Sequence, residues 1–158
     1  MKDFRPQTCC FTGHRIIPAG MRDILARRLD VAIDAMIQEG YCYFGAGGAL
    51  GFDTMAAQSV LRAKEKYPHI RLILVLPCRD QAAKWNIRNR RIYEDILSKS
   101  DRKVYMTDVY TEDCMFRRNR RLVECSSACI CYLTKTGGGT AYTVREAEQH
   151  GLRIVNLA

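Results

Sequence analysis

The fold is decided by the stretch Gly45-Ala46-Gly47-Gly48-Ala49-Leu50-Gly51-Phe52-Asp53. An apolar run at 41–45 leads into it, and apolar residues at helical spacing, among them Met55 and Val60, follow it. Four glycines within seven residues, between a strand and a helix, leave backbone N–H groups free to converge on an anion at the positive helix end. The stretch therefore predicts a strand–loop–helix unit with a phosphate-binding loop. A flexible turn with close helix–strand packing would need fewer glycines, and it stays open as the alternative.

Five further apolar runs flank this unit, and helical patterns lie between them. The runs are continuous rather than alternating in polarity, which is typical of strands covered on both faces. Gly40, Pro68 and Gly151 end three of the helical patterns. The expected strands are 8–12, 41–45, 70–76, 103–107, 128–133 and 153–157, and the last three helices are expected at about 80–98, 113–125 and 140–150.

This alternation predicts an α/β fold: a Rossmann-like, doubly wound sheet of about six mostly parallel strands, with helices on both faces. A closed barrel would need more strands and a longer chain. The sequence shows no linker, repeat or low-complexity segment, so residues 1–158 are interpreted as one domain. In such sheets ligands bind beyond the carboxyl ends of the strands, where the strand order reverses. The loops at those ends are therefore the candidates for function.

The composition is that of an ordinary globular protein with an excess of basic residues. Hydrophobic residues make up 47% and charged residues 27%, and the formal net charge is +8. Such a charge favours anionic partners, whether a nucleotide, a nucleic acid or a phosphorylated metabolite. Residues 1–10 are polar and the apolar runs are only strand-length. We therefore expect no signal peptide, no membrane contact and a cytoplasmic protein.

The chain contains eight cysteines, but their placement favours reduced thiols. Cys9, Cys129 and Cys131 fall within expected strands and Cys42 lies at the start of another, where a thiol acts as a small apolar side chain. The sequence has no CxxC pair, and Cys125 does not stand at zinc-knuckle spacing from the strand cysteines. We therefore expect no metal site.

Three more loops carry candidate ligand-binding residues. The first expected strand leads into Thr12-Gly13-His14-Arg15, where glycine permits a close approach and Arg15 could clamp an oxyanion. The third leads into a loop with Gln81 and Trp85, and the tryptophan could stack on a base or pack under the loop. The fifth leads into Gly137-Gly138-Gly139-Thr140, where the threonine could cap the next helix or bond a phosphate oxygen.

An arginine-rich segment, Arg117-Arg118-Asn119-Arg120-Arg121, precedes the fifth strand. Repulsion among these arginines is tolerable on a solvated helix face, but a bound anion would relieve it. We expect one phosphate between loops 45–51 and 137–140, with charge supplied by Arg15 and by Arg118 or Arg120. The expected ligand-binding glycines of these two loops are Gly45, Gly47, Gly48, Gly51, Gly137, Gly138 and Gly139.

Three residues are candidates for acid–base chemistry: Asp53, His14 and Glu146. Asp53 could cap the helix after the first glycine loop, or it could hold a ribose hydroxyl or a water. A histidine with a near-neutral pKa can carry a proton, but in a glycine turn it more often bonds the backbone. The assignment of a catalytic residue therefore stays open.

Taken together, these motifs resemble the SLOG superfamily, named for the Smf/DNA-processing and Lonely-Guy proteins, and within it the small YpsA/YspA-like branch. The likeness extends over nearly the whole chain. Residues 12–15 are similar to that branch's opening motif, and 47–53 to its second. The segment 116–120, followed by a strand, a glycine–threonine loop and a helix that ends in glycine, is similar to the arginine–asparagine–arginine region of the DNA-processing protein.

The resemblance implies a Rossmann-like sensor or enzyme whose relatives bind nucleotides, ADP-ribose-like signals or single-stranded DNA. Lonely-Guy members hydrolyse the N-glycosidic bond of nucleoside 5′-monophosphates with an arginine and a glutamate, the latter in a Pro-Gly-Gly-x-Gly-Thr-x-x-Glu motif. Here Lys135 and Thr136 replace the proline and glycine, Thr143 replaces the glutamate, and Glu146 stands three residues further on. A hydroxyl cannot act as a carboxylate base, which disfavours this hydrolysis.

Three functions follow, in order of preference. The first is a sensor or regulatory module that binds a nucleotide or a nucleotide-derived ligand, such as a nucleoside phosphate or an ADP-ribose-like molecule, and requires no cofactor. The second is a phosphoribohydrolase of Lonely-Guy type. The third is binding of single-stranded DNA, a nucleic-acid partner that usually meets several exposed aromatic platforms beside basic residues. If the chain self-associates, we expect a dimer.

Overall fold

The computed structural model describes residues 2–158, and these form one six-stranded parallel sheet. The strand order is β4-β3-β2-β1-β5-β6, and every neighbouring pair is parallel. The predicted Rossmann-like α/β sheet is therefore confirmed. The strands are β1 (Thr8–Gly13), β2 (Tyr43–Ala46), β3 (Arg71–Cys78), β4 (Arg102–Thr107), β5 (Ala128–Tyr132) and β6 (Arg153–Asn156).

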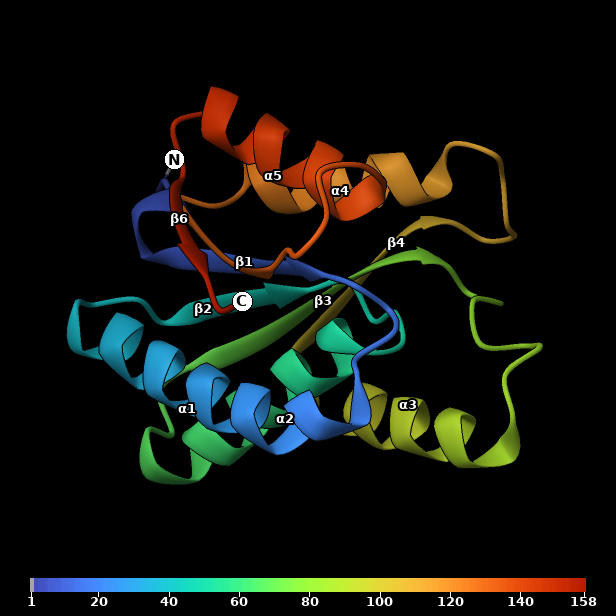
Figure 1. Ribbon diagram of the computed structural model, residues 1–158, viewed down its shortest axis with the longest axis horizontal. Coiled ribbons are helices and arrows are strands. Elements are labelled where there is room, and N and C mark those ends of the chain that lie inside the picture. The colour runs from blue at the N-terminus through green and yellow to red at the C-terminus, as the bar shows by residue number, and fades with distance from the viewer. Residues whose placement is uncertain (1) are drawn as a thin grey trace.

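Helices cover both faces of the sheet (Figure 1). One face carries α1 (Arg22–Gln38), α2 (Phe52–Lys66) and α3 (Ile87–Lys99), which make the connections from β1 as far as β4. The other carries α4 (Cys114–Glu124), on the crossover from β4 to β5, and α5 (Gly139–Gln149). The chain therefore moves outward from β1 to β4, crosses over, and continues on the other side of β1, which makes the β1–β5 junction the switch point.

Two hydrophobic layers separate the helices from the sheet. The layer under α1–α3 is the larger and contains Phe11, Phe44 and Phe52, each at most 1% exposed. The layer under α4 and α5 uses small side chains, including Cys10 and Cys129, which are register neighbours on β1 and β5. The cysteines predicted in strands 1 and 5 are thus buried apolar residues, and the described cysteines are all free thiols.

The sequence-based boundaries differ from the structure most at the third helix. A helix was expected from about residue 80, but 79–84 form turns and α3 begins only at Ile87. The reason is the cap: the side chain of Asn86 accepts a hydrogen bond from the backbone N–H of Asn89 (2.8 Å), which fixes the start of the helix there. Among residues 2–158, no helix is long and apolar enough to cross a membrane.

Gly51 lies where the backbone of loop 45–53 packs most closely against the backbone of loop 12–15. It precedes α2 with φ +78°, and an added Cβ would overlap the backbone of Arg15. The backbone N–H of the next residue, Phe52, donates to the carbonyl of His14 (3.1 Å). Glycine is therefore required at position 51 both for its conformation and for the space it leaves.

We expect Gly51→Ala to lower the free energy of unfolding by more than about 3 kcal/mol, because left-handed backbone and overlap with main-chain atoms act together. Gly151→Ala is the matched control. Gly151 has φ +80° with open space around it, so only the conformational cost of about 1 kcal/mol applies. Urea unfolding of both variants measures the difference. If both variants lost the same free energy of unfolding, the loops 12–15 and 45–53 could move apart at little energetic cost.

Candidate functional site

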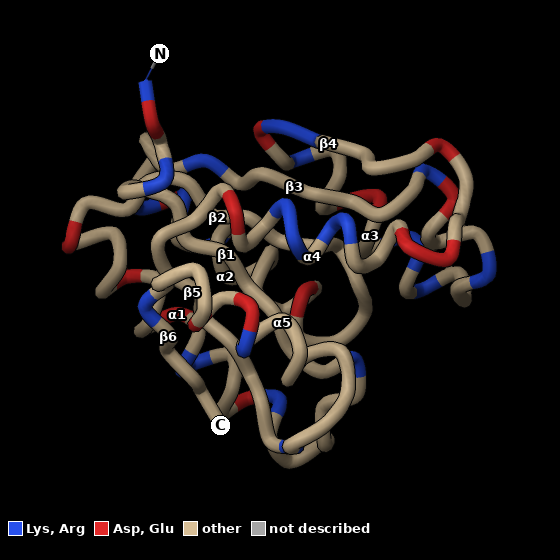
Figure 2. Tube along the Cα trace, turned by 90° about the horizontal axis from the view of Figure 1, so that it is seen from above, with Lys and Arg blue, Asp and Glu red and all other residues tan. Residues whose placement is uncertain are grey.

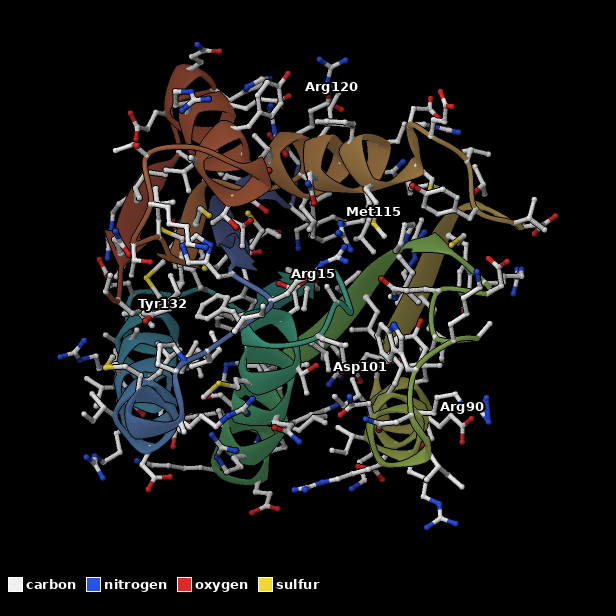
Figure 3. All side chains as sticks on the ribbon, turned by 45° about the vertical axis from the view of Figure 1, so that its right-hand side comes forward. Arg15, Arg90, Asp101, Met115, Arg120 and Tyr132 are labelled. Carbon is white, nitrogen blue, oxygen red and sulfur yellow. The ribbon has the colours of Figure 1, made fainter. Side chains whose placement is uncertain are left out.

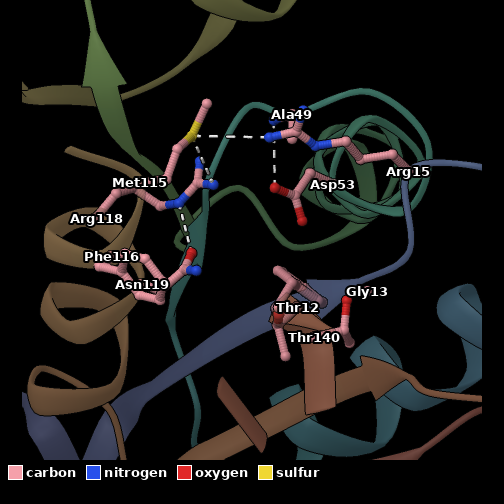
Figure 4. Close-up of a pocket in the computed structure, with 12 residues that line it drawn as sticks. Thr12, Gly13, Arg15, Ala49, Asp53, Met115, Phe116, Arg118, Asn119 and Thr140 are labelled. Atoms are coloured by element: carbon pink, nitrogen blue, oxygen red, sulfur yellow. Dashed lines mark hydrogen bonds between the residues drawn. The ribbon is translucent and has the colours of Figure 1, made fainter. Parts of the chain in front are cut away.

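A pocket of about 350 Å³ lies at the switch point, beyond the carboxyl ends of β1 and β5 (Figure 4). We call it the switch-point pocket. It is enclosed by the end of β1 and the loop after it, the loop between β2 and α2 with the start of α2, one face of α4, and the N-terminal turn of α5. Its lining residues are Phe11, Thr12, Gly13, Arg15, Ala49, Asp53, Met115, Phe116, Arg118, Asn119, Gly139 and Thr140.

The Arg118 side chain is a buried cation in the wall of the switch-point pocket. It is 4% exposed, and its Nη1 donates to the carbonyl oxygen of Gly47. Its Nε donates to Oδ1 of Asn119 (2.6 Å), and its Nη2 lies 3.6 Å from the sulfur of Met115. Burial lowers the pKa of the guanidinium, and the nearby Asp53 carboxylate opposes that shift. All three nitrogen atoms are thus engaged within the protein.

Asp53 is the buried carboxylate of the switch-point pocket. It is 7% exposed, and Oδ2 accepts a hydrogen bond from the backbone N–H of Ala49 (3.2 Å). Burial raises the pKa of this carboxyl above its ordinary value, while Arg118, the Ala49 amide and Arg15 act in the opposite direction. The carboxylate therefore braces the glycine loop from inside α2 rather than capping the helix start at Gly51.

The glycines of loop 45–51 are packed against protein. A Cβ at Gly47 would lie 2.6 Å from Nη1 of Arg118 and 2.9 Å from Oδ2 of Asp53. A Cβ at Gly48 would lie 2.5 Å from Leu76, and one at Gly45, inside β2, would lie 3.0 Å from Leu122. These three glycines are buried and do not line the switch-point pocket. Packing explains why side chains are missing there.

The glycines of loop 137–140 are in the opposite situation. Added Cβ atoms at Gly137, Gly138 and Gly139 would meet nothing within 4 Å. Gly138 is the N-cap of α5 with φ +93°, and Gly139 and Thr140, the first two helical residues, line the switch-point pocket. The N–H groups of a first helical turn have no partner within the helix and carry its positive dipole end. This loop therefore presents unobstructed donors to the pocket.

Arg15 reaches across the switch-point pocket from the loop after β1 (Figures 3 and 4). Its Nη2 lies 3.7 Å from the sulfur of Met115 on α4, the same atom that Arg118 approaches. Unlike Arg118 it is exposed. Two arginines and one carboxylate line the pocket, Arg15 and Arg118 against Asp53, so its walls carry one net positive charge. The site is suited to an anion.

Several predicted site residues lie outside the switch-point pocket. Nε2 of His14 accepts a hydrogen bond from the backbone N–H of Thr134 (3.0 Å), and burial lowers the pKa of the imidazole. Nε2 of Gln81 lies 3.4 Å from the Gly48 carbonyl, and Trp85 packs edge-to-face on Tyr93. The histidine thus bonds the backbone, and the tryptophan packs beneath its loop.

Arg120 and Glu146 also point elsewhere. Nε of Arg120 pairs with Oε1 of Glu146 at 3.2 Å, on the outer side of α4 and α5. Figure 3 shows Arg120 on the side of α4 opposite Met115. Of the two arginines proposed to supply charge, Arg118 therefore faces the switch-point pocket and Arg120 does not. Four arginines follow closely in the middle of α4 (Figure 2), so their number alone does not identify the inward one.

Of the four α4 residues that line the switch-point pocket, Arg118 and Asn119 were predicted site residues, whereas Met115 and Phe116 were not. Met115, Arg118 and Asn119 have the spacing of one helix face, and this signal was available once 113–125 was predicted as a helix. Arg118 also stands midway between the buried residues Cys114 and Leu122, at four-residue intervals. A basic residue at the spacing of buried apolar residues indicates that its side chain points toward the protein interior.

Comparisons with known proteins agree with this architecture. A UPF0398 protein of Bacillus pumilus (strain SAFR-032) is 29% identical over 125 residues, which are 77% of this chain and 67% of that protein. DNA processing protein A from Streptococcus pneumoniae matches with a TM-score of 0.67 at 16% identity, over 93% of this chain and 48% of its own. This chain thus spans about half the length of that protein, and the likeness shows the fold alone.

DNA processing protein A from Helicobacter pylori, which binds single-stranded DNA, matches with a TM-score of 0.69 at 17% identity, over 95% of this chain and 64% of its own. A family model described as the YspA SLOG family matches residues 19–154, which include α2, α4 and α5 with the walls they contribute to the switch-point pocket. Because that match covers most of the sequence, the chain belongs to the YspA SLOG family.

Proposed function

We propose that the switch-point pocket binds the phosphate end of a nucleotide or nucleotide-derived ligand, and that the protein acts as a sensor or regulatory module. Family membership and fold fit nucleotide or DNA binding broadly. The observation that carries the finer proposal is the open N-terminal turn of α5, which faces Arg15 and the buried Arg118 across the pocket. Backbone donors and two cations thus converge on one space.

Each donor has a distinct part in this proposal. The N–H groups of Gly139 and Thr140 would hold phosphate oxygens, and the exposed Arg15 is free to form a charge-assisted hydrogen bond. Arg118 has its nitrogens engaged by Gly47, Asn119 and Met115, so it would contribute charge at a fixed place rather than a direct clamp. A volume of about 350 Å³ suits a small ligand.

Binding is favoured over hydrolysis by the positions of the candidate acids and bases. Thr143, where Lonely-Guy enzymes have glutamate, is buried, and its hydroxyl donates to the carbonyl of Gly139 (3.0 Å). Glu146 pairs with Arg120, and His14 bonds the backbone of Thr134. Of the three candidates, Asp53 alone lines the switch-point pocket. One oxygen of its carboxylate already accepts a hydrogen bond from the Ala49 amide, so Asp53 supports the pocket wall.

Single-stranded nucleic acid is the second candidate ligand, because an aromatic pair stands at the edge of the switch-point pocket. Phe116 is 58% and Tyr142 47% exposed, and their rings meet edge-to-face at 5.7 Å. Exposed rings beside Arg120, which lines a shallow depression together with Tyr142, could stack bases. The two candidates differ in salt dependence, since a strand that contacts many cations loses affinity steeply as salt rises.

We expect Gly139→Val to abolish AMP binding while thermal unfolding stays cooperative. A side chain at position 139 meets nothing in the protein, so it would occupy only the space that the ligand needs. Gly137→Val is the matched control, because that position is equally open but lies outside the switch-point pocket. Titration calorimetry measures both. Wild-type affinity in Gly139→Val would place the phosphate elsewhere.

We expect Arg15→Ala to weaken AMP binding about tenfold or more, since a hydrogen bond to a charged group contributes roughly 1.5–3 kcal/mol. Arg120→Ala removes another exposed arginine, one that faces away from the switch-point pocket, so affinity should hardly change. Calorimetry at two salt concentrations, with AMP and an oligonucleotide in parallel, gives the comparison. Similar losses in both variants, with a steep salt dependence, would favour a distributed nucleic-acid surface instead.

We expect Asp53→Asn to strengthen AMP binding by roughly fivefold at pH 7.5, because it removes a negative charge beside the phosphate, worth on the order of 1 kcal/mol. Burial raises the pKa of the Asp53 carboxyl. The wild-type carboxyl therefore takes up its proton at a higher pH than usual, and the two affinities should converge as pH falls. Comparing both proteins at each pH cancels the titration of the phosphate itself. Weaker binding in Asp53→Asn would instead mean that the carboxylate holds the ligand directly.

A further inference from the structure

A second concavity of about 640 Å³ adjoins the switch-point pocket on the side of α1, α2 and α3. We call it the α3 groove. Arg22, the first residue of α1, and Arg88, in the first turn of α3, line it together with Asn86, Asn89 and Gln58. Arg15 lines the α3 groove and the switch-point pocket alike, so the two concavities meet at this residue.

The α3 groove carries positive charge that the protein does not balance. Within residues 2–158, the side chains lining it include no carboxylate, and the ion pairs do not include Arg15, Arg22 or Arg88. Elsewhere arginines do find partners: Arg62 pairs with Asp30 and Arg153 with Glu39. Three arginines sharing one concavity without a counter-charge favour an anion there.

The remaining lining suits the uncharged part of such an anion. Leu50, Met55 and Ile92 contribute apolar surface to the α3 groove, and Asn86 and Asn89 contribute polar amide side chains. An apolar surface with a few polar groups and localised charge is typical of sites for ligands that carry a ring and a phosphate. A free inorganic anion has no apolar part that could contact these side chains.

Resting on the function proposed above, we infer that the ligand carries a second phosphate group, separated from the first by a nucleoside, and that Arg22 and Arg88 bind it in the α3 groove. The ligand class is a compact dinucleotide. The first phosphate lies at Gly139 and Thr140, and Arg15 spans the two parts. A longer strand is disfavoured because the exposed arginines of α4 lie on the opposite face of the sheet from Arg22 and Arg88.

The test compares four probes by titration calorimetry on the full chain: AMP, ADP, the 5′-phosphorylated dinucleotide pApA, and a longer 5′-phosphorylated oligoadenylate. ADP adds charge without the reach of a second nucleotide. We expect pApA to bind about tenfold more tightly than either mononucleotide, as one added charge-assisted contact would provide. The longer oligoadenylate should bind no more tightly than pApA, because the ligand ends within the α3 groove.

The variants separate the two parts of the site. Arg22→Ala and Arg88→Ala should each remove most of the gain of pApA over AMP while AMP affinity stays near that of wild type. Arg91→Ala is the matched control, since Arg91 is an exposed arginine of the same helix that does not line the α3 groove. Thermal unfolding of each variant checks that the fold is kept, and Arg22→Gln and Arg88→Gln serve where alanine destabilises it.

The outcomes distinguish the two proposals. If AMP binds, and pApA binds no more tightly than ADP, the second phosphate site is overturned and the switch-point pocket stands. If Arg91→Ala costs as much as Arg88→Ala, or the longer oligoadenylate binds far more tightly than pApA, the surface is a nucleic-acid track and the compact ligand is overturned. If neither AMP nor pApA binds, both proposals fall together.

Discussion

The guanidinium of Arg118 is buried against the Gly47 carbonyl and beside the carboxylate of Asp53, and much of the site follows from accommodating it. A buried cation needs hydrogen bonds and a nearby negative charge, because desolvation alone would cost several kcal/mol. The glycine loop supplies a carbonyl, α2 a carboxylate and α4 the amide of Asn119. The glycine loop with α2, and α4, whose Arg118 lies 71 residues beyond Gly47, are thereby fixed around one side chain.

The burial of Arg118 also explains why the two glycine-rich loops differ in their surroundings. Gly47 must lack a side chain because the guanidinium and Asp53 occupy that space, and Gly51 because the Arg15 backbone does. The loop after β5 has no such neighbour: its glycines face open space at the helix start. Loop 45–51 therefore packs against the Arg118 side chain and the Arg15 backbone, whereas loop 137–140 stays open, as the proposed phosphate site requires. Similar composition thus serves different ends.

The fold was predictable because its signals are local and repeated. Continuous apolar runs, helical spacing and terminal glycines agree along the whole chain, and such agreement specifies a parallel sheet. The start of α3 was misjudged because a single side-chain cap at Asn86 decides it, and the turn residues before it are compatible with a helix. Which polar residue caps a helix depends on several nearby candidates, and the spacing of hydrophobic residues carries no information about that choice.

The candidate site was predictable only in part, because sequence shows which residues are near a strand end but not which way they face. Of the predicted site residues, Arg15, Gly139 and Thr140 line the switch-point pocket, whereas His14, Gln81 and Trp85 make backbone or core contacts. The arginine segment shows the limit most clearly. Successive helical residues diverge by about 100°, so neighbours in sequence reach opposite sides of α4.

Thr143 connects this geometry to the choice between holding a ligand and cleaving it. Its hydroxyl bonds the carbonyl one turn back, at Gly139, within the first turns of α5. A carboxylate at this place could not donate that bond, and it would add negative charge beside the donors that the helix start presents to the switch-point pocket. With threonine at this position, the partial positive charge at the N-terminus of α5 is not reduced, and no carboxylate is present there to promote bond cleavage. For the proposed phosphate site, threonine at position 143 therefore favours retention of the anionic ligand over its cleavage, as the proposed sensor role requires.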